Sequence, residues 1–399
     1  MEEKKKAYAY WLNSIPGIGS KTIQELLDSI GDYEEIYASS EERLGCFLKK
    51  KQLEMLEEYQ RSRIPEEEYE KLLKQNILFF TKEEEQFPKK LKEIPDPPQA
   101  IFVKGKVPSS DILSVAVVGA RECSNYGSYI GSELGRRLAL AGFQVISGMA
   151  RGIDGICQQA ALAAKGASFG VLGCGVDICY PAQNRALYER LLINGGVLSC
   201  YLPGTLPRPE LFPPRNRIVS ALADVVVVVE ARKRSGTFIT VDMALEQGKE
   251  VYAVPGRISD GLSDGCNYLI KQGAGVILEI DEFIEELKMQ FALRCTFRKD
   301  RKEAGKIQKP LQASSGRIPE RMPEKEADTI DDFIEEERVA KALDMNPKSV
   351  EQIRRDIRES LSYQETLTQL VQLVLKGRAV QVSTGYFAVC PPGGRSDFL

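Results

Sequence analysis

The 399-residue sequence contains no histidine, which excludes Ser-His-Asp triads and acid–base catalysis by imidazole. Its nine cysteines form no Cys-x-x-Cys pair, so a zinc site would need four scattered thiolates. Neither a GxGxxG dinucleotide fingerprint nor a GxxxxGK[ST] phosphate loop occurs. We therefore expect no metal and no cofactor.

Long apolar runs and an excess of positive charge are also missing. No stretch of about 18 apolar residues occurs, so we expect no membrane span. The N-terminus shows no signal-peptide pattern, and with an odd number of cysteines this favours a cytoplasmic protein. Because the formal net charge is −3, a site for a polyanion must come from local clustering of cations.

The pattern of residues that are present changes along the chain. Apolar residues recur at helical spacing over residues 1–76, which predicts a helical domain. Within it, "IPGIGSKT" (15–22) either presents free amides to a phosphate at a helix N-terminus or forms an ordinary turn between helices. Residues 77–110 are rich in proline and are predicted to pack as an extended strap against the next part of the chain.

Short valine-rich strands alternate with helices from residue 114 to about 285. "DVVVVVEARKRSGTFIT" (224–240) is typical: a buried strand ends in three cations and a loop of small hydroxyl residues. The alternation predicts an α/β fold, an extended Rossmann-like, doubly wound parallel sheet, in a domain of residues 77–285.

The rest of the chain is predicted to form a linker and a small domain. Residues 286–328 are charged and lack periodicity, as in a flexible linker. Residues 329–399 contain three helical stretches and a hairpin, a winged-helix-like pattern. Its third helix offers one cation, so we expect a structural or protein-contact role rather than DNA reading.

The residues that come directly after the strands identify the candidate site. In open parallel sheets ligands bind beyond the carboxyl ends of the strands. Glycine amides, hydroxyl groups and arginine side chains at these ends all favour an anion. The candidate nucleic-acid-binding residues are Gly119, Arg121, Ser124, Ser147, Gly148, Arg151, Gly152, Phe212, Arg215, Asn216, Arg217, Arg234, Ser235, Gly236 and Thr237.

Arginines on several loops suit a ligand with several phosphates in a row. Single-stranded DNA is such a ligand, since a cationic groove follows its backbone and aromatic rings stack on its bases. Phe212 either supplies such a ring or is a core residue at the entry to a helix.

Six motifs in this order resemble the DNA-processing protein A (DprA/Smf) family: "VAVVGARECSNYG", "VISGMARGID", "YPAQNRALYERLL", "FPPRNRIVSALADVVVVVEA", "RSGTFIT" and "EVYAVPG". The resemblance implies a sterile-alpha-motif-like (SAM-like) or helix-hairpin-helix N-terminal domain, an extended Rossmann core and a winged-helix C-terminal domain. It implies a dimer through the Rossmann core that is not an enzyme. It also implies that the candidate residues bind single-stranded DNA, that the protein protects incoming DNA, and that it loads the RecA recombinase during natural transformation.

Two departures from the family pattern bear on DNA affinity. Cys200 stands where relatives carry an acidic residue, and Pro214 where a basic residue is often found.

Two other function classes remain open from the sequence. One is a nucleotide phosphoribohydrolase of the LOG-like type, in which Glu230 would be the glutamate at a strand end. The other is an interaction scaffold whose arginines are neutralised internally.

Overall fold

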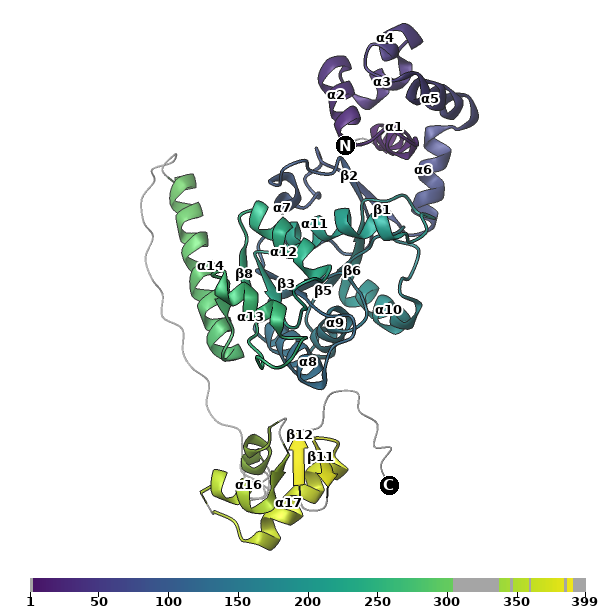
Figure 1. Cartoon of the computed structure of the whole chain (residues 1–399). Helices are drawn as coiled ribbons and strands as arrows, with labels where there is room; N and C mark the ends of the chain where they lie inside the picture. Colours follow the sequence, from purple (N-terminus) through teal and green to yellow (C-terminus); the bar gives the residue numbers. More distant parts are fainter. Residues whose placement is uncertain (1–2, 304–336, 345–346, 359, 384–385, 390–399) are drawn as a thin grey trace, which may run out of the picture. The chain divides into compact units, whose positions relative to one another are not determined.

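The computed structural model describes residues 3–303, 337–344, 347–358, 360–383 and 386–389 (Figure 1). The chain divides into two compact units, Met1–Ala292 and Leu293–Leu399. The first unit contains both the predicted helical domain and the predicted sheet domain.

The first unit begins with six helices whose apolar faces meet. In α2, Ile23, Leu26 and Ile30 recur at helical spacing and are buried. The Asp32 side chain then accepts hydrogen bonds from two backbone amides and so caps α3. The helices are α1 (Glu3–Ser14), α2 (Ser20–Ile30), α3 (Tyr33–Ala38), α4 (Glu41–Gly45), α5 (Lys50–Ser62) and α6 (Pro65–Lys74).

A nine-stranded sheet follows within the described residues, in the order β1-β2-β6-β5-β4-β3-β7-β8-β9. From β6 to β9 neighbouring strands pair in parallel, as predicted. The strands are β1 (Leu78–Thr81), β2 (Ala100–Gly105), β3 (Ser114–Val118), β4 (Gln144–Ser147), β5 (Ser168–Val171), β6 (Gly195–Ser199), β7 (Val225–Val228), β8 (Glu250–Ala253) and β9 (Gly275–Val276).

The strap differs from the prediction because it contributes strands to the sheet. β1 pairs with β2 and β2 with β6, and both pairs are antiparallel. Phe79, Ile101 and Val103 are buried in these strands, which gives the strap an apolar surface to place in the core. The sheet is therefore mostly, but not wholly, parallel.

Helices cover both faces of the sheet, which is why its central strands are mostly apolar (Figure 1). Ala116 of β3 joins the cluster under α7, α11, α12 and α13, and Val117 joins the one under α8, α9 and α14. These helices, with α10 and two short 3₁₀ turns, are α7 (Lys89–Lys92), α8 (Asn125–Leu140), α9 (Ile153–Ala163), η1 (Ala182–Asn184), α10 (Arg185–Asn194), η2 (Pro209–Leu211), α11 (Phe212–Leu222), α12 (Thr237–Glu246), α13 (Asp264–Lys271) and α14 (Ile280–Glu303).

The last of these helices corrects the predicted linker of residues 286–328. α14 continues to Glu303, and Phe283, Ile284 and Leu287 bury its first turns against the sheet. Of these residues only Leu287 lies within the predicted linker, whose first part continues a helix that is anchored before it. Residues 304–328 of the predicted linker lie outside the described residues.

The second unit contains a small antiparallel sheet with helices. Leu370 and Leu373 of α17 pack with Phe387 of β12 in its core. Ser349 and Ser362 each form a capping box at the start of a helix. The elements are β10 (Lys348–Ser349), α16 (Val350–Asp356), α17 (Tyr363–Leu375), β11 (Ala379–Ser383) and β12 (Tyr386–Val389), in sheet order β10-β12-β11.

A search of the described helices for a stretch long and apolar enough to span a bilayer finds none.

Candidate nucleic-acid interface

The predicted site residues come after strands that end at one edge of the sheet, here called the C-terminal edge. From the central strand β3 the chain proceeds to β4, β5 and β6 on one side, and later to β7, β8 and β9 on the other. The order reverses between β3 and β7, which is where open sheets of this kind form a ligand crevice. The loops after β3, β4, β5 and β7 therefore form the rim of this crevice.

An aromatic ring lies among arginines on this rim. The guanidinium carbon of Arg121 lies 5.8 Å, and that of Arg215 lies 5.6 Å, from the centre of the Phe212 ring. Tyr180 lies 5.6 Å from the same ring, tilted by 31°. A Cβ added to Gly173 would lie 2.7 Å from Phe212, so the loop after β5 can hold only glycine there. We call these five residues the Phe212 cluster.

The two arginines of the Phe212 cluster have different environments. Arg121 is exposed, whereas Arg215 is only 6% exposed and donates to the carbonyl oxygens of Gly148 and Val171. Burial lowers the pKa of the Arg215 guanidinium, and the nearby Asp154 carboxylate opposes this. Arg215 therefore holds the loops after β4 and β5 together from inside the protein, whereas Arg121 exposes its guanidinium to solvent.

Asp154 completes this buried support. Its carboxylate accepts the backbone N–H of Gly148 at 3.0 Å. Burial raises the pKa of the Asp154 carboxyl above its ordinary value, and the charge of Arg215 acts against the rise. The amide of Gly148, predicted to face an anion, is thus already bonded to a carboxylate of the chain.

The loops after β3 and β4 fit together closely. Gly152 has a φ of +71°, and a Cβ there would lie 2.2 Å from the carbonyl oxygen of Ala120. Only glycine satisfies both the backbone conformation and the contact. Asn184 fixes the loop after β4 by donating to the carbonyl oxygens of Met149 and Ala150. The exposed side chain of Arg151 extends from this loop.

Two predicted hydroxyl donors are used inside the protein. Ser147 Oγ donates to the Val117 carbonyl oxygen at 2.6 Å. Ser124 Oγ donates to the carboxylate of Glu230 and accepts the N–H of Gly127. Gly119, just after β3, lies between Ile153 and the Glu230 backbone. These residues shape the rim, and their role in binding DNA stays a prediction.

The remaining predicted residues lie apart from the Phe212 cluster. Arg217, one turn along α11, donates to the carbonyl oxygens of Pro95 and Asp96 in the strap. Asn216, beside it, is partly exposed. The loop with Arg234, Ser235, Gly236 and Thr237 opens α12 and is fastened to α13, because the N–H of Lys233 donates to Asp264 at 2.9 Å. The structure thus brings Arg121, Phe212 and Arg215 together, and it leaves Arg151 exposed on the neighbouring loop. Arg217 contacts the strap instead.

Sequence reasoning missed three residues at this edge. Tyr180 is 42% exposed beside Phe212. Arg185 is the exposed first residue of α10, and Arg208 is exposed directly before η2, which leads into α11. The motif "YPAQNR" contained Tyr180 and Arg185, and extending the strand-end rule to whole loops would have found all three.

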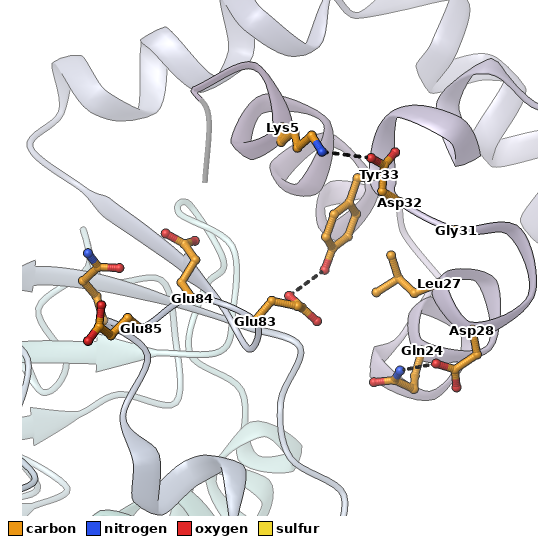
Figure 2. Close-up of a pocket in the computed structure, with 11 residues that line it drawn as sticks. Lys5, Gln24, Leu27, Asp28, Gly31, Asp32, Tyr33, Glu83, Glu84 and Glu85 are labelled. Atoms are coloured by element: carbon orange, nitrogen blue, oxygen red, sulfur yellow. Dashed lines mark hydrogen bonds and ion pairs between the residues drawn. The ribbon is translucent and has the colours of Figure 1, made fainter.

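A separate cleft in the first unit carries the wrong charge for DNA (Figure 2). Its volume is about 820 Å³, and it lies between the first helices and the turn after β1. Asp28, Asp32, Glu83, Glu84 and Glu85 line it, with Lys5 paired to Asp32. Because carboxylates repel phosphates, this cleft is no site for a nucleic-acid backbone.

The geometry also bears on metals and on the glutamate of the phosphoribohydrolase alternative. No group of three or more potential metal-ligating side chains is found in the described part of the chain. Glu230 is fully buried and bonded to Ser124. It is therefore not placed to meet a ribose, as that alternative requires.

Comparisons with known proteins show the family to which the sheet region belongs. Residues 78–288 match the family model described as DNA recombination-mediator protein A. Protein Smf of Synechocystis sp. is 32% identical over 291 residues, which is 70% of this chain and 72% of that protein. Protein Smf of Escherichia coli is 43% identical over 208 residues, 52% of this chain and 55% of that protein's length.

A solved structure shows a similar fold over much of the chain. The X-ray structure of DNA processing protein A (DprA) from Streptococcus pneumoniae superposes with a TM-score of 0.62 and 31% identity. The match covers 70% of this chain and 97% of that one. The family match spans the sheet and the whole C-terminal edge, and the chain belongs to the DNA recombination-mediator protein A (DprA/Smf) family.

Proposed function

We propose that the chain binds single-stranded DNA along the C-terminal edge and acts as a recombination mediator without catalysing a reaction. One observation carries the proposal: the exposed guanidinium of Arg121 lies over the ring of Phe212, and Tyr180 lies beside the same ring. A cation for phosphate beside rings for bases is the combination that a single strand requires.

The preference for a single strand follows from the rings. In a duplex the bases are stacked on each other, so Phe212 and Tyr180 could reach none of their faces. In a single strand a base can turn outward and stack while Arg121 and Arg151 contact neighbouring phosphates. Stacking of this kind contributes roughly 1–3 kcal/mol per base.

The absence of catalysis is part of the proposal. The residue best placed in sequence to act on a nucleotide, Glu230, is buried and bonded to Ser124, which supports binding alone. The family description, recombination mediator, supports transfer of the bound strand to a recombinase of the RecA type. Protection of incoming DNA during natural transformation and a homodimer through the Rossmann core belong to the same proposal.

The flanking parts are proposed to adopt the small folds expected from the sequence. α16, α17 and the β11–β12 hairpin have the element order of a winged helix. The N-terminal helices are proposed to form a SAM-like module.

The test is fluorescence anisotropy with labelled single-stranded and duplex oligonucleotides of equal length, at two salt concentrations. We expect preference for the single strand and affinity that falls as salt rises, because phosphate contacts release counterions. Arg121→Ala should weaken binding about ten-fold, the loss of one charge-assisted contact.

A matched control is Arg61→Ala. Arg61 is an exposed arginine on α5, distant in sequence from the rim, and pairs with Glu57 of its own helix. This variant should bind as the wild type does. Equal binding by wild type and Arg121→Ala, or equal affinity for both oligonucleotides, would contradict the proposal.

A further inference from the structure

Glu230 is a buried acidic residue that the proposed function does not use. It lies two residues beyond β7, at the point where the strand order reverses, and is 0% exposed. In the described part of the chain no lysine or arginine forms an ion pair with it. A carboxylate removed from water without a cation is costly unless hydrogen bonds compensate.

The compensation comes from the first turn of α8. Glu230 Oε2 accepts the N–H of Ser124 at 2.9 Å, and Oε1 accepts the Ser124 hydroxyl. A Cβ on Gly127 would lie 2.2 Å from Oε2, so the carboxylate lies directly against the turn and requires glycine there. The partial positive charge of a helix N-terminus stabilises an anion in this place.

This is the position at which a doubly wound sheet holds the phosphate of a nucleotide, at the start of the helix after the first strand of the motif. Here β3 is that strand and α8 is that helix. The chain's own carboxylate thus occupies the place of a ligand phosphate.

Glu230 also holds the other end of the same loop. Its backbone carbonyl oxygen accepts the N–H of Ala120 at 2.8 Å. Glu230 therefore holds both ends of the segment from Ala120 to Ser124. Its backbone carbonyl binds Ala120, and its side-chain carboxylate binds Ser124. Arg121, the exposed cation over Phe212, lies between the two attachments.

We propose that Glu230 is a positioning residue for nucleic-acid binding, an internal anion that replaces a bound phosphate and holds the Arg121 loop in its binding conformation. The inference rests on the proposed function, because it explains how one of that function's contacts is fixed. It also gives Glu230, two residues beyond β7, a role in binding in addition to its place in the protein interior.

The test is a double-mutant cycle between Glu230 and Arg121 in the full chain, read as affinity for a single-stranded oligonucleotide and as its salt dependence. Glu230→Ala should weaken binding about as much as Arg121→Ala, roughly ten-fold. Each should reduce the slope of log affinity against log salt by ~0.7, the value for one lost phosphate contact on a single strand. The double variant should bind no more weakly than Arg121→Ala alone.

Two milder variants keep the test decisive if Glu230→Ala does not fold. Glu230→Gln keeps the shape and one acceptor, and Ser124→Ala removes one of the two contacts. Each should cause a smaller loss than Arg121→Ala, and neither should cause a further loss in the Arg121→Ala background. Additive losses, with an undiminished salt slope in the Glu230 variants, would overturn the inference.

The outcomes separate the two proposals. Absence of binding by the wild type, or full binding by Arg121→Ala, would refute the proposed function and the inference with it. Binding that depends on Arg121 but is lost additively with Glu230 would refute the inference alone.

Discussion

Arg121 and Arg215 lie on the same aromatic ring, yet burial assigns them different tasks. The buried guanidinium of Arg215 donates to two carbonyl oxygens from the loops after β4 and β5. It also faces Asp154, a carboxylate buried with it. Arginine in a sequence suggests phosphate binding, but Arg215 is buried and belongs to the core.

Replacing Arg215 should cost stability before it costs binding. In Arg215→Met two carbonyl oxygens lose their donor and Asp154 loses its compensating charge. We expect a loss of about 3 kcal/mol in the free energy of unfolding, as for breaking a buried pair. Arg121→Met, at the exposed position on the same ring, should remain within about 0.5 kcal/mol of wild type. Urea denaturation of both variants measures the difference.

The same substitution should have a pH signature. Burial raises the pKa of Asp154, so the native state holds its proton more tightly than the unfolded state, and stability falls as pH rises through the native pKa. Removing Arg215 raises that pKa further. The stability gap between wild type and Arg215→Met should therefore widen from acidic to neutral pH, and Asp154→Asn in the variant should abolish the widening. A gap that is constant with pH would show that Asp154 is not involved.

At the scale of elements, the helices beside the site approach each other through glycine. α8 carries Gly131 and Gly135 one turn apart, both facing α9 or its start. A Cβ on Gly135 would lie 2.2 Å from the backbone oxygen of Cys157, whereas one on Gly131 would lie 3.6 Å from Ile153. The distance between α8 and α9 is thus set at Gly135.

Alanine should have opposite effects at these two glycines. Gly135→Ala forces backbone apart and should destabilise the protein by about 1–3 kcal/mol. Gly131→Ala meets only ordinary contacts and should raise helix stability by up to about 1 kcal/mol. Denaturation midpoints with unchanged slopes would measure both effects. Equal losses at the two positions would contradict the packing described.

The elements that the sequence predicted best are those with the simplest physical cause. Val225–Val228 is apolar on both faces because helices cover both. An uninterrupted run of valines predicts such a strand from the sequence alone. The strap strands β1 and β2 and the helical start of the linker were not predicted. These segments pair with strands and helices that are distant in the sequence. A local pattern of residues does not predict such partners.

At the scale of the whole molecule, each of the two units has apolar clusters of its own. The three large apolar clusters extend from Ala7 to Phe291, and a fourth lies between Val339 and Val389. The candidate site lies wholly among the first three. The strand-end rule located this edge, but a single sequence contains nothing to show that Arg215 would be buried or that Arg217 would bond to the strap.

A chain ending at Ala292 should therefore fold and bind without the second unit. We expect its thermal unfolding transition to coincide with one transition of the full chain, and its affinity for a single-stranded oligonucleotide to be unchanged. Calorimetry and anisotropy on both chains make the comparison. A large loss of affinity in the shortened chain would place part of the binding surface in the second unit.

The interlock of the loops after β3 and β4 has a kinetic consequence. Gly152 is pressed against Ala120, whose N–H is already bonded to the Glu230 main chain. The rim loses its conformational entropy during folding, so little ordering remains when a ligand arrives. The association rate is then set by how often a single strand collides with the rim in the right orientation. Because opposite charges meet in this collision, the association rate should rise as the salt concentration falls.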